Sequence, residues 1–313
     1  MGEARYPAKS GAPVVMDLAT FLIQLLNAFQ YGLLLFLIAG GLTLIFGIMG
    51  IINLAHGSFY MVGAYLAWSL SMHLGSLWLA LPAGIVLSVL LGIALEWLLI
   101  RRLYRLGHLQ QVLLTYGLIL VVEELRSIIW GDEVHGVPVP ELLSASIPLT
   151  DTLSYPVYRL WISAVCIVLA VLLYVLIQRT RLGMTIRAGA TNREMVQSLG
   201  IDIDLLYRFV FALGVALAAF AGMIAAPVSS VFPGMGNQVL IVCFVVVVIG
   251  GIGSVKGAMI GALLIGLVDT FGKVVELKVG SFRLLPELAG MSVYLLMAVV
   301  LLWRPAGLFG KRA

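Results

Sequence analysis

The sequence predicts an all-α fold: a polytopic transmembrane helical bundle of eight to ten spans, with broken or re-entrant helices. Two observations carry this prediction. Hydrophobic residues make up 62% of the 313 positions and charged residues only 11%, whereas soluble domains contain about 25% charged residues. Long apolar stretches also recur along the whole chain, and a spanning helix needs about 20 such residues. We therefore expect a single transmembrane domain over residues 1–313.

The individual spans are predicted from the apolar stretches. They fall at about 20–50, 57–75, 77–100, 109–130, 157–178, 208–228, 238–255, 257–272 and 287–303. The first stretch is too long for one simple span and has Gly40 and Gly41 in its middle. It is either one tilted helix or a helix followed by a half-helix, and both alternatives remain open.

Charged loops orient the bundle. Arginine and lysine gather in segments 101–105 and 179–208 and in the C-terminal tail, whereas segment 131–156 has acids but no Lys or Arg. Loops rich in Lys and Arg stay in the cytoplasm. We therefore expect the C-terminus and the first two segments inside and segment 131–156 outside. Segment 273–283 argues mildly against this pattern, because it is cationic yet lies outside by span count.

Several function classes receive little support. The net charge of +4 is small, which argues against a nucleic-acid partner. Cys166 and Cys243 lie inside apolar runs, so no disulfide framework and no metal site is expected. The chain has no phosphate-binding loop of the ATPase type, no zinc-protease motif and no serine-hydrolase motif. We therefore expect neither an enzyme nor a cofactor site in this chain.

A first helix break is predicted where two apolar stretches meet. Asn53, His56 and Gly57 lie there with further glycines around them. Polar side chains at membrane depth need partners, and broken helices are tolerated where they line a cavity. One interpretation is a break that lines a translocation path. The alternative is a short cytoplasmic turn with an ordinary polar pair.

A second break is predicted at Gly250, Gly251 and Gly253, before Lys256 and Gly257. The spacing does not fit a phosphate-binding loop, because glycine follows the lysine. A tight re-entrant turn fits better. Two glycine-broken segments, one in each half, are what an internal transporter repeat leaves, although chance similarity in helices rich in small residues explains them about as well.

The cationic segment 179–208 contains a short amphipathic pattern. Asn192 is placed to cap a helix, Met195, Val196 and Leu199 would form its apolar positions, and Gly200 would end it. The segment is either a solvated loop or a docking helix for a cytoplasmic partner.

Acidic residues within the apolar stretches leave a second transport mechanism open. Glu123 and Glu124, followed by Arg126, lie in the stretch 109–130, and intramembrane acids are functional candidates. Either acid would suit the ion site of a secondary transporter, but the amphipathic segment would then be unexplained. Glu96 and Asp269 lie near span ends and are expected to matter less.

The residues resemble a known family: the LivH-like permease subunits of branched-chain amino acid ABC importers. The resemblance covers nearly the whole chain. It rests on Gly41 to Gly47; on Ile52 to Gly57 with Tyr60, Met61, Gly63, Ala64 and Tyr65; on Arg187 and Ala188 with Leu199, Gly200 and Ile201; on Ala221, Gly222, Pro227 and Pro233 to Gly236; on Val248 to Ser254 with Gly257, Ala258 and Gly261; and on Arg304 to Gly310.

The resemblance implies a division of labour in the bacterial inner (cytoplasmic) membrane. A second, homologous LivM-like permease, two cytoplasmic ATPase subunits that bind ATP and Mg, and a periplasmic substrate-binding protein would be the partners. A coupling helix at about 188–201 would dock on the ATPase, with these residues as candidates: Arg187, Ala188, Arg193, Glu194, Leu199, Gly200 and Ile201. Transport would follow alternating access.

The cargo that the resemblance implies is a branched-chain or other hydrophobic amino acid, or a related small solute such as urea, an amide or an aromatic acid. The binding protein carries most of the specificity in this family. Val196, Gln197 and Ser198 depart from the alanine that the family often has in its coupling loop.

Overall fold

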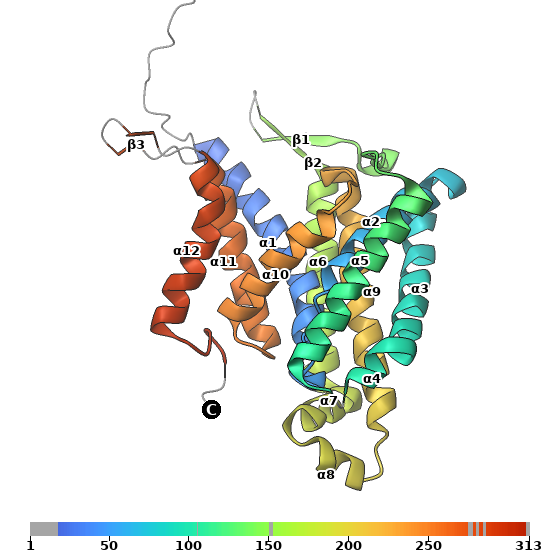
Figure 1. The fold of residues 1–313 in the computed structure, drawn as a ribbon. Helices are drawn as coiled ribbons and strands as arrows, with labels where there is room; N and C mark the ends of the chain where they lie inside the picture. The colour runs from blue at the N-terminus through green and yellow to red at the C-terminus, as the bar shows by residue number, and fades with distance from the viewer. Residues whose placement is uncertain are drawn as a thin grey trace, which may run out of the picture.

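The computed structural model describes residues 18–104, 106–149, 153–274, 278–279, 282–283 and 286–310. Its long helices form a bundle that runs between two ends (Figure 1). They are α1 (Leu18–Met49), α2 (His56–Leu74), α3 (Leu77–Leu95), α5 (His108–Trp130), α6 (Val157–Arg179), α9 (Ile203–Ser229), α10 (Met235–Gly250), α11 (Val255–Val274) and α12 (Pro286–Trp303). Each one corresponds to a predicted apolar stretch, so the all-helical fold is confirmed.

Among the residues that the structure describes, membrane-spanning capacity is clearest for five segments. By length and composition alone these are long and apolar enough to cross a bilayer: Leu18–Met49, Leu77–Leu103, Val157–Arg179, Ile203–Ser229 and Val255–Val274. The segment Leu77–Leu103 includes a π-helical turn, η1 (Glu96–Ile100), and a last turn, α4 (Arg101–Leu103). Eight to ten spans with re-entrant elements remains a prediction.

The long first stretch is one continuous helix of 32 residues. Its most apolar window is 89% buried, as expected for a helix that is hydrophobic on every side. Gly40 and Gly41 do not break it. A Cβ at Gly41 would lie 2.8 Å from the carbonyl oxygen of Gly214 in α9. The glycine there permits close helix contact, and the half-helix alternative is excluded.

Small residues also bring α2 and α9 together. A Cβ at Gly63 would lie 2.0 Å from the carbonyl oxygen of Ala219, and one at Gly222 would lie 2.0 Å from that of Tyr60. Because lipid tails are as apolar as the side chains, close packing of this kind rather than the hydrophobic effect holds membrane helices together.

The connections separate into two groups at opposite ends of the bundle (Figure 1). At one end, here the α8 end, lie α4, α7 (Arg181–Thr191), α8 (Arg193–Ser198) and the tail 304–310. At the other, the β1 end, an antiparallel pair joins β1 (Ser146–Pro148) to β2 (Ser154–Pro156) after the short 3-10 helix η2 (Glu141–Leu143). A second antiparallel pair is formed by β3 (Lys278–Val279) and β4 (Phe282–Arg283).

This arrangement agrees with the predicted grouping of charges. The cationic segments 101–104 and 179–202 and the tail lie at the α8 end, and the acidic segment 131–149 leads into β1 at the other end. The cationic exception at 273–283 is partly compensated, because Lys273 forms an ion pair of 2.6 Å with Asp269 one turn earlier in α11.

Candidate functional site

The first predicted break exists between α1 and α2. Helix α1 ends at Met49, Gly50 has a φ of +65°, and α2 begins at His56. His56 Nε2 lies 2.9 Å from the carbonyl oxygen of Ile38. Asn53 Oδ1 accepts a hydrogen bond of 3.1 Å from the Ala55 amide. The polar pair therefore satisfies backbone groups inside the protein.

Both side chains of this pair are 0% exposed. Asn53 Nδ2 and His56 Nδ1 have no hydrogen-bond partner among the described residues, and an unsatisfied buried polar atom costs about 1–3 kcal/mol. Neither residue lines either of the two cavities described below. A Cβ at Gly57 would lie 2.2 Å from the carbonyl oxygen of Gly236, so this glycine brings α2 against α10.

The second predicted break lies between α10 and α11. Helix α10 ends at Gly250, and Gly251 and Gly253 take φ values of +97° and +79°, a region that glycine enters without strain. The tail covers the end of α10: the amides of Leu308 and Phe309 donate to the carbonyls of Ile249 and Gly250 at 2.8 and 3.0 Å.

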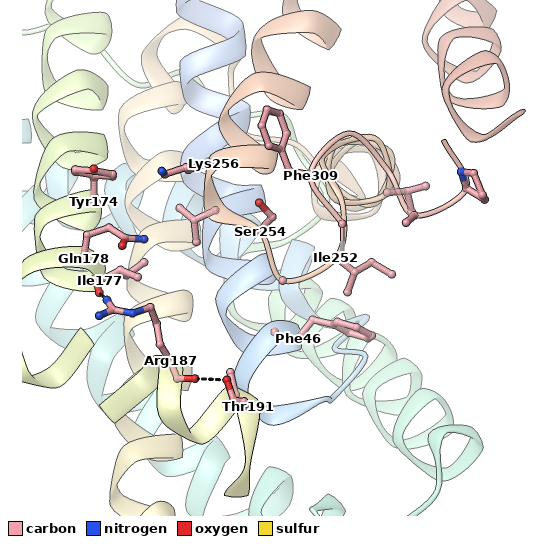
Figure 2. Close-up of a pocket in the computed structure, with 18 of the residues that line it drawn as sticks. Phe46, Tyr174, Ile177, Gln178, Arg187, Thr191, Ile252, Ser254, Lys256 and Phe309 are labelled. Carbon is pink, nitrogen blue, oxygen red and sulfur yellow. Dashed lines mark hydrogen bonds between the residues drawn. The ribbon is translucent and has the colours of Figure 1, made fainter. Parts of the chain in front are cut away.

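The two breaks meet where α1 ends. A Cβ at Gly47 would lie 2.7 Å from the Cα of Gly253. Beside this contact is a cavity of about 810 Å³, here the α8-end cavity (Figure 2). It is lined by Phe46, Gly47, Tyr174, Ile177, Gln178, Arg187, Ala190, Thr191, Val248, Ile252, Gly253, Ser254, Val255, Lys256, Leu301, Pro305, Ala306, Phe309 and Gly310.

Arg187 and Lys256 make the α8-end cavity cationic. They come from α7 and α11, and the lining includes no carboxylate. The Lys256 ammonium lies 6.0 Å from the centre of the Tyr174 ring, and Arg187 donates to the carbonyl of Ile177. The structure thus brings together Arg187 and Gly253, whereas Asn53, His56 and Gly57 belong to the packed interior.

The segment after α6 forms two helices. Thr180 Oγ1 accepts from the Gly183 amide at 3.0 Å and begins α7. Asn192 ends α7 and accepts from the Met195 amide at 3.0 Å to begin α8. Gly200 follows with a φ of +81°. The predicted cap and stop are confirmed, but the single coupling helix expected at 188–201 is wrong, because Asn192 is extended and divides it.

Helix α8 has a fixed face and a free face. Val196 is 3% exposed and packs into the core, whereas Met195 and Leu199 are 61% and 74% exposed. Of the predicted coupling residues, these are exposed at the surface of the chain: Arg187, Ala188, Glu194, Leu199, Gly200 and Ile201.

Arg193 connects α8 to the membrane helices. Its guanidinium lies 5.4 Å from the centre of the Tyr207 ring and 6.0 Å from that of Tyr104. Both distances suit cation–π contacts. The Tyr104 hydroxyl donates to Glu96 at 2.5 Å. Burial and the bond to Glu96 raise the pKa of Tyr104, so its hydroxyl keeps its proton.

Glu96 is the buried end of this connection. It is 0% exposed and also accepts from Arg208 Nε at 3.0 Å. The residue begins the π-helical turn η1, and such turns are frequent at functional sites. Sequence reasoning gave Glu96 little weight because it lies near a span end. The signal that could have found it was an acid in an apolar helix, eight residues before a tyrosine.

The acids proposed for a secondary transporter are placed differently. Glu123 forms an ion pair of 3.4 Å with Arg126, which also pairs with Asp132 at 2.7 Å. Arg126 is 6% exposed and donates to the carbonyl of Gly131 at 2.6 Å. Glu124 lies on the exposed face of α5. The cluster ties the end of α5 to the following loop.

Comparison with protein families gives one match over most of the chain. Residues 24–301 match the family described as "Branched-chain amino acid transport system / permease component". The matched region contains both glycine breaks, the α8-end cavity except for its tail residues, and α7 and α8.

Individual relatives agree with this match. The chain is 30% identical over 311 residues to the LivH permease protein of the high-affinity branched-chain amino acid transport system of Escherichia coli K12, covering 93% of this chain and 96% of the relative. It is 29% identical over 307 residues to BraD of Pseudomonas aeruginosa, with the same coverage. The ribose import permease RbsC of Haemophilus influenzae is 31% identical over 248 residues, 74% of this chain and 72% of the relative. No solved structure matches.

Proposed function

The chain belongs to the permease-component family of branched-chain amino acid ABC importers, and from this premise we propose that it forms one half of the importer's pore. As a member of that family it is a transport permease and not an enzyme. The other half would be a second, homologous permease. Two cytoplasmic ATPases would bind ATP and Mg, and a periplasmic binding protein would deliver the cargo.

The two-faced α8 carries this proposal. Val196 fixes the helix to the core while Met195 and Leu199 face away from the chain. An apolar stripe on a charged surface needs a partner to cover it. The groove of an ATPase subunit would bury these two side chains, and Gly200 would let the chain turn back toward α9.

Movement of α8 would reach the membrane helices by two routes. One runs through α7 to α6, since a Cβ at Gly183 would lie 2.2 Å from the Ile177 carbonyl oxygen and Arg187 donates to that same oxygen. The other runs from Arg193 through Tyr104 to Glu96 and Arg208. Both routes consist of contacts between neighbouring side chains and backbone groups, as a coupling element needs.

Sidedness follows from the same assignment. With α8 on an ATPase, the α8 end and the C-terminus are cytoplasmic and the β1 end is periplasmic, in the inner membrane of a bacterium. The cationic segments at the α8 end agree with the positive-inside rule. The residues that line the translocation path would include Asn53 and His56 at the first break and Gly250 and Gly253 at the second. They would become exposed when the two permeases of the pore move relative to each other.

A matched pair of substitutions tests the docking role. We expect Leu199→Asp to abolish most ATP-driven leucine uptake by the complete importer in proteoliposomes, because a carboxylate cannot be buried in an apolar groove without a partner. Leu142→Asp, at an 82% exposed leucine of the β1 end, is the control and should transport normally. Normal uptake by Leu199→Asp, with ATPase still bound, would refute the assignment.

A further inference from the structure

A second cavity opens at the β1 end, opposite α8. It has a volume of about 470 Å³, within the range of small-molecule sites. Residues of the first half of α1, the beginnings of α2 and α6, and the last turns of α9 and α11 surround it. Its lining is Gln24, Asn27, Gln30, Tyr31, Leu34, Tyr60, Arg159, Ala225, Val228, Ser229, Asp269, Thr270, Lys273 and Val274.

Arg159 gives this cavity a positive charge that forms no ion pair with any residue that the structure describes. Its Nη1 donates to Asn27 Oδ1 at 2.8 Å, and it interacts with the Tyr155 hydroxyl. Both partners are neutral. No ion pair involves Arg159 in the described part of the chain. Because a guanidinium binds a carboxylate through two parallel hydrogen bonds, Arg159 is available to an anionic group that enters the cavity.

Asp269 supplies the opposite charge from another helix. Its carboxylate is 15% exposed and pairs with Lys273 at 2.6 Å. Lys273 is 61% exposed, so water screens its ammonium and competes with the carboxylate for it, which weakens the pair relative to a fully buried one. An ammonium group inside the cavity can therefore replace Lys273 at the carboxylate at little cost.

The rest of the lining separates into polar and apolar groups. The amides of Gln24 and Gln30 and the hydroxyls of Tyr31 and Tyr60 offer donors and acceptors, and Leu34, Ala225, Val228 and Val274 offer aliphatic surface. The α8-end cavity differs, since it has two cations and no acid. Of these two cavities, the one at the β1 end combines both charges with an aliphatic wall.

We propose that the β1-end cavity is a low-affinity acceptor site for a free, zwitterionic aliphatic α-amino acid. Arg159 binds its carboxylate, Asp269 binds its ammonium, and the aliphatic lining receives its side chain. The site rests on the proposed function and adds to it, because it gives the permease its own selection for cargo released at the periplasmic side. Recognition of both charges disfavours simple amines and carboxylic acids, which carry only one of the two.

Binding can be measured without the periplasmic protein. We suggest saturation-transfer NMR on the solubilised complex of permeases and ATPases, with leucine, 3-methylbutylamine and 4-methylpentanoate as probes. The amine lacks the carboxylate and the acid lacks the ammonium. We expect leucine to bind the wild type about tenfold more tightly than either analogue, since each loses one charge-assisted contact.

Substitutions locate the contacts. Arg159→Gln should weaken leucine about tenfold and leave 3-methylbutylamine unchanged, and Asp269→Asn should weaken leucine but leave 4-methylpentanoate unchanged. Arg159→Lys should retain part of the affinity, which guards against a folding defect. Arg102→Gln, an exposed arginine at the α8 end, is the control.

Three results would overturn the site. Equal affinity of the wild type for leucine and its two analogues would show that the site does not recognise a zwitterion. Unchanged leucine affinity in Arg159→Gln would show that Arg159 does not bind the carboxylate. If Arg159→Gln left leucine binding intact and weakened only the affinity of the importer for its periplasmic binding protein, Arg159 would be a docking contact for a carboxylate of that protein. Failure of the proposed function looks different, because the wild-type importer itself would then take up no amino acid under ATP.

Discussion

At the scale of residues, the most informative side chain is Glu96. A carboxylate that is 0% exposed must be paired, since burying an isolated charge is costly. Its two partners come from separate places, Tyr104 after α4 and Arg208 in α9. One buried acid thus ties the π-helical turn of the third long helix to α9.

Two substitutions of Glu96 should distinguish its contribution to protein stability from its contribution to the coupling of ATP hydrolysis to uptake. We expect Glu96→Ala to lower the free energy of unfolding by about 3 kcal/mol, because Arg208 loses its partner. Glu96→Gln keeps one of the two oxygen acceptors, for Tyr104 or for Arg208, and should cost less. In Glu96→Gln we expect ATP hydrolysis to continue while uptake falls severalfold. Thermal unfolding in detergent and uptake in proteoliposomes measure the two effects; full uptake in both variants would contradict the role.

The polar pair at the first break gives a second prediction. Asn53 and His56 are 0% exposed in this structure. If the pair lines the path only in another state, Asn53→Cys and His56→Cys should resist small hydrophilic thiol reagents without nucleotide and react when ATP drives turnover. Leu142→Cys should react in both conditions. Inaccessibility of both positions in every state would instead assign the pair to packing.

At the scale of elements, the helices were predictable and their contacts were not. Apolar stretches located the ends of every long helix to within five residues, and Asn192 and Gly200 marked both ends of α8. Contacts between segments far apart in the sequence could not be predicted. The contact of Gly47 with Gly253, the cover of the tail over α10, and the joining of Glu96 to Arg208 unite segments far apart in the sequence. Local periodicity contains no information on them.

The close contacts of α2 and α9 predict a sharp difference between two glycines. A Cβ at Gly63 would collide with backbone at 2.0 Å, whereas one at Gly117 in α5 meets nothing within 4 Å. We expect Gly63→Ala to destabilise the protein by about 1–3 kcal/mol. Gly117→Ala should be neutral or stabilise it by up to about 1 kcal/mol through helix propensity. Unfolding in denaturant checks this, and equal effects would refute the packing argument.

At the scale of the whole molecule, two cavities lie at opposite ends of a packed middle. The α8-end cavity reaches Phe46 of α1 and the β1-end cavity reaches Leu34. Between them, α1 from residue 35 to residue 45 is buried throughout. This buried stretch lies between the α1 residues that line the two cavities. Under the proposed alternating access, we expect helix movement or the interface with a second permease to open the path.

Sidedness is testable with the same two leucines. In right-side-out membrane vesicles we expect a membrane-impermeant thiol reagent to label Leu142→Cys and to leave Leu199→Cys untouched until the vesicles are opened. Both side chains are well exposed, 82% and 74%, so burial cannot explain a difference. The reverse pattern would invert the assigned orientation.

The contact between α8 and an ATPase is the central claim, and photo-crosslinking tests it most directly. A photoreactive amino acid at position 199 in the assembled, transport-competent importer should capture the ATPase subunit on illumination, and the same group at position 142 should not. Capture of the ATPase from position 199 alone is the result we predict. A working importer in which position 199 captures no ATPase would contradict the account.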